Sequence, residues 1–206
     1  RDGSQAYHNE CIGSLSLGVK IGETYTDYSQ GSVRQTGGTY DLALSGSGFF
    51  TVSVADKAGE VHTRYTRDGR FHLTKDGLLV DADGNAVQGQ NGNITIDPSS
   101  KNVSISATGQ ITADGELVDT LNIVDFEDYD YLKKYGDTMY EPVDGATTKD
   151  AEGEILQGYT EQSNVNVVRE MVDMITITRA YEASQKVIHS YDSMLDKSVN
   201  QVGALK

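Results

Sequence analysis

The 206-residue sequence has one cysteine, two prolines and no tryptophan. The single cysteine, Cys11, excludes a disulfide within the chain and a cysteine-based zinc cluster, since each needs at least two thiols. No run of residues approaches the roughly 20 apolar positions that a membrane-spanning helix needs. The sequence begins at Arg1 rather than Met, so we expect it to be a fragment of a longer protein.

Positive charge is also scarce, with 17 lysines and arginines against 31 acidic residues and a formal net charge of −14. Nucleic-acid binding requires a basic face, so this charge balance argues against a nucleic-acid partner. The acidic excess is concentrated between Asp114 and Glu161, where 14 acids face three lysines. We interpret this stretch as a solvated acidic surface that aids solubility.

Glycine and tyrosine are plentiful, at 22 and 12 residues, and short alternating segments predict many strands joined by turns. After a polar lead-in at residues 1–16, we expect a β-rich domain over residues 17–162. Its first strand contains Val19 and Ile21. Further strands are predicted at residues 41–44, 49–54, 62–66, 70–73, 78–80, 85–88, 94–96, 103–106, 110–112 and 121–126. Residues 127–157 are expected to form loops with one or two strands.

Three Asp-Gly pairs lie between residues 65 and 89, and a fourth is Asp114-Gly115. Asp-Gly between alternating segments predicts a type I′ hairpin turn, which needs positive φ at both central residues. The stretch Asp81-Ala82-Asp83-Gly84-Asn85 also resembles the start of a calcium loop. An EF-hand loop needs glycine at position 6 and glutamate at position 12, and neither register of this stretch supplies both. The spacing therefore favours turns over a metal site.

The pattern changes at residue 163 and predicts a long helix over residues 163–206. Asn164 or Asn166 can cap it, and no proline or glycine interrupts it before Gly203. Apolar residues recur every seven positions, at Val167, Met174, Tyr181, Ile188, Leu195 and Val202. Sustained heptads favour a coiled-coil seam with a second helix. The partner would lie on another chain or on the part of this chain before Arg1. Folding back onto the sheet is the alternative.

The sequence predicts no catalytic residues, no metal site and no cofactor or small-molecule substrate. The four histidines show no ligand spacing, and the Ser45–Gly48 stretch lacks the glycines of a nucleophile elbow or a dinucleotide loop. These features suit a structural assembly subunit. A secreted β-rich adhesin or glycan-binding module is an alternative of another class, and it would need a cluster of exposed aromatic side chains on one sheet face. An enzyme is the third choice.

Five stretches of the sequence resemble the rod and hook proteins of the bacterial flagellar basal body. In chain order they read QGSVRQTG (30–37), DLALSGSGFF (41–50), YTRDGRF (65–71), QGYTEQSNVN (157–166) and EMVDMITITRAY (170–181). Each stretch alone is a weak signal, but together and in this order they are highly specific. Tyr40 stands where the family often has a proline-containing pair, which is a mild departure.

The resemblance implies a mainly β fold, an irregular domain of short hairpins with a long C-terminal α-helix that pairs with an N-terminal helix. It also implies export by the flagellar type III pathway and helical assembly with copies of itself and with other flagellar axial proteins. Residues 12–19 resemble the distal rod members, and proximal rod and hook members are the alternatives. The expected seam consists of Val167, Met174, Tyr181, Ile188 and Leu195.

Overall fold

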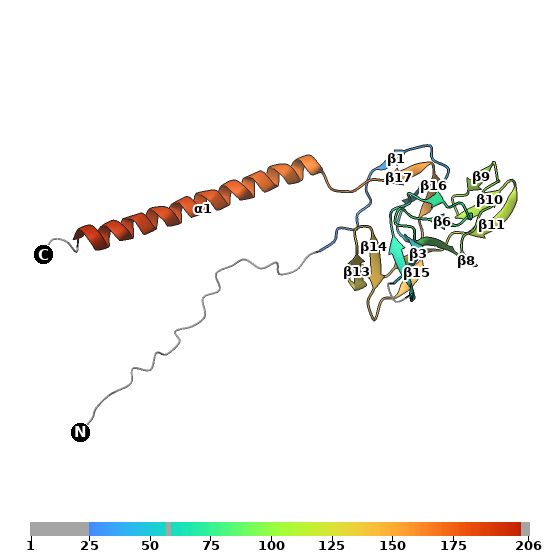
Figure 1. Cartoon of the computed structure of the whole chain (residues 1–206), viewed down its shortest axis with the longest axis horizontal. Coiled ribbons are helices and arrows are strands. Elements are labelled where there is room, and N and C mark those ends of the chain that lie inside the picture. The colour runs from blue at the N-terminus through green and yellow to red at the C-terminus, as the bar shows by residue number, and fades with distance from the viewer. Residues whose placement is uncertain (1–24, 57–58, 203–206) are drawn as a thin grey trace, which may run out of the picture.

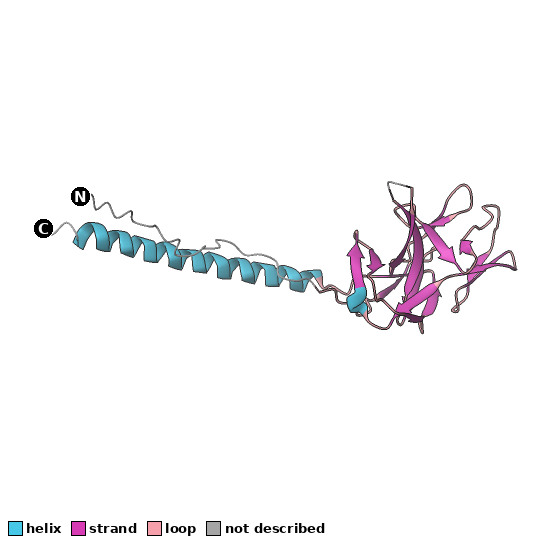
Figure 2. Cartoon of the chain, turned by 90° about the horizontal axis from the view of Figure 1, so that it is seen from below, coloured by secondary structure: helices cyan, strands magenta, loops and turns pink. Residues whose placement is uncertain are grey.

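The computed structural model describes residues 25–56 and 59–202. It consists of a β domain and a single long helix, α1 (Val167–Val202), that extends away from that domain (Figures 1 and 2). The fold class expected from the sequence is therefore confirmed, and the alternative of a helix folded back on the sheet is wrong. The predicted lead-in at residues 1–16, the strand at Val19 and Ile21, and Cys11 lie outside the described residues.

The strands are short. They are β1 (Val33–Gln35), β2 (Leu42–Ser45), β3 (Phe49–Ala55), β4 (Val61–Thr66), β5 (His72–Leu73), β6 (Leu79–Val80), β7 (Ala86–Gly89), β8 (Gly92–Asn93), β9 (Val103–Ile105), β10 (Gln110–Ala113), β11 (Glu116–Thr120), β12 (Ile123–Phe126), β13 (Leu132–Tyr135), β14 (Met139–Pro142), β15 (Thr148–Asp150), β16 (Glu154–Gln157) and β17 (Tyr159–Glu161). A short 3-10 helix at Tyr129–Tyr131 precedes β13.

Strand β3 is the centre of the largest sheet. It pairs antiparallel with β4 over six residues, from Phe50 opposite Thr66 to Ala55 opposite Val61. Its other edge pairs with β12 at one end and β7 at the other. Strands β5, β6 and β7 pair antiparallel in chain order, whereas β12 reaches β3 across about 70 residues of sequence.

Both faces of β3 are buried, which gives the domain two apolar clusters. Phe50 and Val52 belong to the larger cluster, which includes Leu42, Leu44 and Ile111. Phe49 points the other way, into an aromatic cluster with Phe126 and Leu132. Val54 packs against the same larger cluster, so Phe50, Val52 and Val54 share one face of β3. The aromatic cluster was not predicted, because the residues that complete it come from segments far apart in sequence.

The Asp-Gly pairs do not share one turn type. Within the described residues, Asp114 is the sole non-glycine residue with positive φ, at 51°, and Gly115 follows at 93°. Asp114-Gly115 thus fits the predicted two-residue turn, between Ala113 and its register partner Glu116. The type I′ prediction is wrong for the other pairs. At Gly77 and Gly84 only the glycine has positive φ, 81° and 87°, as in a longer loop closed by a glycine.

The loop that resembled a calcium site closes on its own hydrogen bonds. The Oδ1 atom of Asp81 accepts hydrogen bonds from the backbone N–H of Asp83 at 3.0 Å and of Asn85 at 2.8 Å. The Asn85 side chain donates to the same carboxylate. Asp81 is buried, so its carboxylate serves the turn itself, in agreement with the turn interpretation.

Several strands differ from the expectation. The predicted strand at residues 94–96 is reduced to a single antiparallel bridge between Thr95 and Leu78, flanked by the fully buried Ile94 and Ile96. Strands β1, β11 and β17 were not predicted, and residues 127–157 contain four strands rather than one or two. In these segments tertiary packing and cross-strand partners, rather than local alternation, determine the structure.

Helix α1 begins where the capping argument places it. The Asn166 side-chain oxygen accepts hydrogen bonds from the backbone N–H of Val168 at 3.1 Å and of Arg169 at 3.2 Å, so Asn166 is the N-cap. The helix has 36 residues, which corresponds to about 54 Å at 1.5 Å per residue. This length exceeds what the small β domain can cover.

Candidate assembly surfaces and the joint between them

Helix α1 exposes its apolar side chains along its described length. The five predicted seam residues all lie on it, and each is 60–67% exposed: Val167, Met174, Tyr181, Ile188 and Leu195. Seven residues correspond to nearly two turns, so these side chains form one line that drifts by about 20° per repeat around a straight helix. The structure thus brings the seam residues onto one surface, and it shows no partner for them in the described chain. A line of exposed apolar side chains is typical of an interaction surface.

The N-terminal and C-terminal parts of the described chain meet beside the first turn of α1. Strands β1 and β17 pair antiparallel, with Val33 opposite Glu161. Beyond them, the Asn164 side-chain amide donates hydrogen bonds to the backbone oxygens of Asp27 and Ser29, both at 3.1 Å. The segment that enters the β domain and the segment that leaves it for α1 are therefore held together.

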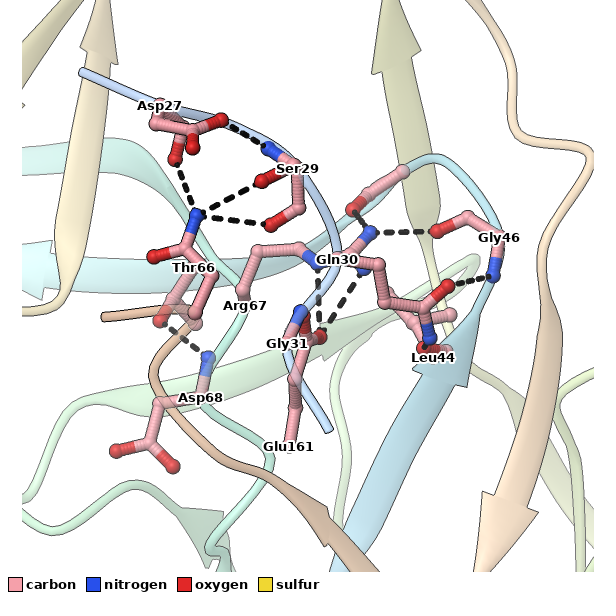
Figure 3. A network of polar contacts seen from close by, with 12 residues as sticks. Asp27, Ser29, Gln30, Gly31, Leu44, Gly46, Thr66, Arg67, Asp68 and Glu161 are labelled. Atoms are coloured by element: carbon pink, nitrogen blue, oxygen red, sulfur yellow. Dashed lines mark hydrogen bonds and ion pairs between the residues drawn. The ribbon is translucent and has the colours of Figure 1, made fainter. Parts of the chain in front are cut away.

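An ion pair fixes this meeting point to the β domain. Arg67, which follows β4, lies 3.0 Å from Glu161 through both its Nε and its Nη2 atoms. Its Nη1 atom donates to the backbone oxygens of Gly46 and Gly48, both at 2.8 Å. Figure 3 shows these contacts converging on Arg67 and Glu161. The side chains are 22% and 11% exposed, so the pair is largely withdrawn from water. We call Gln30, Gly31, Arg67, Glu161 and Asn164 the joint.

The incoming segment is bound by the same joint. Glu161 accepts a hydrogen bond from the Gly31 backbone N–H at 2.9 Å. Gln30 donates to the Leu44 backbone oxygen at 2.9 Å and accepts from the Gly46 N–H at 3.1 Å. A Cβ at Gly31 would lie 1.7 Å from the Gln162 backbone oxygen, so only glycine allows this approach. The side chains of Gln30 and Asn164 are exposed, so water reaches the rim of the joint while Arg67 and Glu161 are largely buried.

Tyr28 adds an apolar anchor to the joint. Its ring contacts the rings of Tyr129, Tyr140 and Phe49 in the aromatic cluster, at centroid distances of 4.9, 5.4 and 6.3 Å. Offset and edge-to-face contacts of this kind stabilise beyond the buried area alone. Burial raises the pKa of Tyr28. The segment before β1 is thus attached by an aromatic side chain as well as by hydrogen bonds.

The aromatic cluster also contains a buried carboxylate. Asp125 is fully buried, and its Oδ1 atom accepts hydrogen bonds from the Tyr129 hydroxyl and the Phe126 N–H, both at 2.8 Å. Burial opposes ionisation of Asp125, but these hydrogen bonds and Lys149, 3.1 Å from Oδ2, lower its pKa below the ordinary value. Burial, followed by the hydrogen bond to Asp125, raises the pKa of Tyr129 to about 12. These pKa shifts are those expected of a buried carboxylate that is paired with hydrogen-bond donors and a lysine and that stabilises the fold.

A broad cleft of about 970 Å³ lies beside the joint, lined by residues 25–31 and 160–165 and by the β13–β14 hairpin. Its charged side chains are mixed in sign, including Arg34, Lys134, Asp27 and Asp137. Among the described residues no group of three or more His, Cys, Asp or Glu side chains is placed to hold a metal ion. In the same part of the chain no helix has the length and hydropathy needed to cross a bilayer.

Sequence reasoning proposed a helix seam but did not indicate the joint. Arg67 and Glu161 carry no local signal of pairing, since they are 94 positions apart. Each does lie in a stretch that carries the family resemblance, Arg67 in residues 65–71 and Glu161 with Asn164 in residues 157–166. The presence of polar residues in both of these distant stretches is the signal that could have indicated the contact between Arg67 and Glu161.

Comparison with known proteins decides the family. Residues 43–113 match the family model described as "Flagellar hook protein FlgE/F/G D1 domain". Residues 156–202 match "Flagellar basal body rod FlgEFG protein C-terminal". A flagellar basal-body rod protein FlgG of Buchnera aphidicola subsp. Schizaphis graminum is 36% identical over 196 residues, covering 89% of this chain and 73% of the relative. The chain belongs to the flagellar basal-body rod protein family.

Other relatives agree. The FlgG rod protein of Bacillus subtilis is 32% identical over 205 residues, covering 90% of this chain and 74% of the relative. A rod protein named FlgF, from Caulobacter vibrioides, is 34% identical over 181 residues, with 87% of this chain and 72% of the relative covered. Within this rod protein the two family models meet at the joint, because Arg67 lies in one matched region and Glu161 in the other.

Proposed function

We propose that this protein is a structural subunit of the bacterial flagellar basal-body rod, which assembles helically into the drive shaft that transmits torque for motility. The family and its location in the basal body are those of its relatives, which are rod proteins. The observation that carries the mechanism is α1, a 36-residue helix whose apolar side chains are exposed over its described length. Such a helix needs a partner outside the described chain.

The proposed contact is a helix pair along the seam of Val167, Met174, Tyr181, Ile188 and Leu195. Apolar side chains every seven residues place a second helix against α1 with left-handed packing. The partner helix is the N-terminal helix of the same protein, and copies then stack through contacts in which one face meets a different face of the neighbour. Contacts of that type do not close and produce a filament. Other axial proteins of the flagellum continue the stack.

The joint suits this role because it fixes the direction in which α1 leaves the β domain. An ion pair with four additional hydrogen-bonding groups, Gly31, Gly46, Gly48 and Gln30, resists bending of that connection. A shaft that transmits torque requires such stiffness within each subunit. Among the members of the family, the relatives named FlgG support the distal rod protein as the assignment, with proximal rod and hook proteins as the alternatives.

The glycan-binding alternative lacks support. It requires exposed aromatic side chains on one sheet face, whereas Tyr28, Tyr65, Tyr129 and Tyr140 pack against the aromatic cluster. The relatives are rod proteins, so a structural role is favoured over binding of a carbohydrate. A structural role is also favoured over catalysis, since the polar groups of the joint are engaged with one another rather than directed at a substrate.

Motility provides the test. In a bacterium whose own copy of the gene is deleted, the full-length gene carrying Ile188→Ser and Leu195→Ser should not restore swimming, and basal bodies should end without a complete rod in electron micrographs. The matched control is His189→Ser with Asp196→Ser, each one residue further along and about 100° around α1 from the seam position. This control should restore swimming. Normal rods in the Ile188 and Leu195 variant would refute the seam.

A further inference from the structure

Strand β13 forms an open edge of the largest sheet. It pairs with β14 on one side, and no described strand pairs with its other side. The backbone N–H of Val143 donates to the Tyr131 oxygen, so residues 131, 133 and 135 are hydrogen-bonded to β14, and the backbone groups of Leu132 and Lys134 turn outward. The Tyr28 hydroxyl donates to the Leu132 oxygen at 3.4 Å. Lys134 is therefore the position at which a further strand could bind.

The side chains along this edge are basic and partly apolar. Lys133 and Lys134 are the only two adjacent basic residues in a sequence with a net charge of −14, and both are exposed. Tyr131, Tyr135 and Val143 are each 41–47% exposed on the same hairpin. Two adjacent lysines oppose pairing of β13 with the β13 of another copy. The edge therefore favours a strand with an acidic and an apolar side chain.

Strand β11 has these properties at a second open edge. It is the outer strand of the three-stranded sheet. Ala113 and Glu116 close a two-residue turn, so they are hydrogen-bonded to each other and the backbone groups of Leu117 turn outward. Glu116 is exposed, and Leu117 is 62% exposed. The charge and the apolar side chain of β11 thus complement those of β13.

The two edges lie on opposite sides of the β domain. Figure 1 shows β13 on the side nearest α1 and β11 on the side farthest from it. A chain therefore cannot pair its own β13 with its own β11. A contact between β13 of one copy and β11 of the next joins two different faces, which is the type of contact that extends from copy to copy.

We propose that β13 of one copy pairs antiparallel with β11 of a second copy, with Lys134 opposite Leu117. The outward backbone groups of these two residues exchange both N–H···O hydrogen bonds. Lys133 then lies diagonally across from Glu116 on the same face, within reach of its carboxylate. The inference rests on the proposed assembly of this protein with copies of itself, and it assigns the contact between β domains to these two strands.

The contact is short, because β13 has four residues and β11 has five. A single pair of copies is therefore held weakly, and repetition of the contact along an assembly strengthens it. A covalent trap detects such a weak contact in the isolated chain.

Disulfide trapping tests the pairing in the 206-residue chain. With Cys11→Ser in every variant, Lys134→Cys is mixed with Leu117→Cys in a glutathione redox buffer. Facing residues of such a pair have Cα atoms about 5.5 Å apart, which suits a disulfide. The disulfide between the two variants should exceed the disulfide of either variant with itself about tenfold.

The matched control replaces Leu117→Cys with Val61→Cys. Val61 is also an apolar strand residue and is 65% exposed, but it lies on β4. It should give no excess of the mixed disulfide. Equal yields with Leu117→Cys and Val61→Cys would overturn the proposal, as would a predominance of disulfides between two Lys134→Cys chains.

Charge reversal tests the register. Lys133→Glu in the Lys134→Cys chain brings two carboxylates together and should lower the yield of the mixed disulfide several-fold. Adding Glu116→Lys to the Leu117→Cys chain should restore the yield, because opposite charges meet again. Lys75→Glu, at an exposed position, changes the net charge equally and should leave the yield unchanged. Two losses that add without restoration would contradict the proposed pairing.

These measurements separate the strand contact from the role in a rod. The motility test of the seam depends on α1 and not on β13 or β11. Loss of swimming in the seam variant without a disulfide excess would support the rod role and exclude the strand pairing. A disulfide excess together with full swimming in the seam variant would do the reverse.

Discussion

The Asp-Gly pairs of this protein need their glycine for different physical reasons at different places. Gly84, in one Asp-Gly pair, has a φ of 87° and open space where a Cβ would lie. Gly69, in another pair, is buried and is not among the residues with positive φ. Its requirement comes from close packing, since a Cβ there would lie 1.8 Å from the Leu42 backbone oxygen. The first glycine is needed for its backbone conformation and the second for its small size.

Alanine substitution should separate these two reasons. Gly84→Ala forces a left-handed backbone on an L residue, which costs about 1 kcal/mol. Gly69→Ala must displace the β2 backbone and lose the hydrogen bond from the Leu42 N–H to the Gly69 oxygen, so we expect a loss of about 3 kcal/mol. Urea denaturation of both variants measures the difference. A smaller loss for Gly69→Ala than for Gly84→Ala would contradict the close-packing explanation. Addition of calcium or a chelator should not change either transition.

Tyr129 makes the free energy of unfolding depend on pH in the alkaline range. Its pKa is raised from 10.0 to about 12 in the folded protein, so folding favours the neutral phenol. The stabilising contribution is complete below pH 10 and is lost as the pH rises toward 12. The free energy of unfolding should therefore decline over this window, and Tyr129→Phe should make the decline smaller. Tyr191→Phe, on the exposed surface of α1, is the control and should leave the decline unchanged.

Strands β1 and β17 have only three residues each, so their pairing depends on side chains. The Arg67–Glu161 pair binds both strands to the rest of the domain. Removing one partner of a largely buried pair leaves the other charge without compensation. Short strands supported in this way should open locally once the pair is broken.

Glu161→Ala should lower the free energy of unfolding by about 2–3 kcal/mol. It should also speed amide hydrogen exchange at Gly31 and Gln162. Arg70→Ala is a suitable control, because Arg70 pairs with Asp68 but its side chain is 64% exposed. Exposed pairs contribute only about 0–1 kcal/mol. Comparable effects of the two substitutions would show that the Arg67–Glu161 pair is not a special support.

A helix or strand could be predicted from the sequence when the residues that determine it lie within that helix or strand. Helix α1 and its cap at Asn166 follow from a heptad repeat and a side-chain acceptor, both contained in the helix sequence. Strand β3 follows from alternation over seven residues. Strands β1 and β17, in contrast, become strands only through each other, 124 or more positions apart. The joint depends on such distant pairs as well, which is why the seam could be proposed from sequence and Arg67–Glu161 could not.

At the scale of the whole molecule, the protein consists of two parts with separate requirements for stability. The β domain encloses both apolar clusters, and none of the described side chains of α1 is buried against it. The helix receives no support from tertiary packing in the described chain, whereas most helices in proteins depend on such packing. The two parts should therefore unfold independently in the isolated chain.

Truncation after Asn166 tests that independence. The truncated chain keeps Asn164 and the joint but loses α1. We expect the unfolding temperature of the β domain to stay within about 2 °C of the full chain, since a loss of 1 kcal/mol would shift it by about 2–4 °C. Far-ultraviolet circular dichroism should show the loss of helix. A fall of more than about 5 °C would mean that α1 stabilises the β domain through contacts outside the described residues.

Because the entering and leaving segments meet at β1 and β17, a pulling force on the two ends of the described chain would reach the β domain at one place. The two strands run antiparallel, so the first residue of β1, Val33, lies opposite the last residue of β17, Glu161 (Figure 1). Such a force would break the hydrogen bonds between β1 and β17 one after another rather than all together. The Arg67–Glu161 pair lies at the end of the strand pair that would open first. Its strength, rather than that of the large sheet, would set the force at which the subunit begins to come apart.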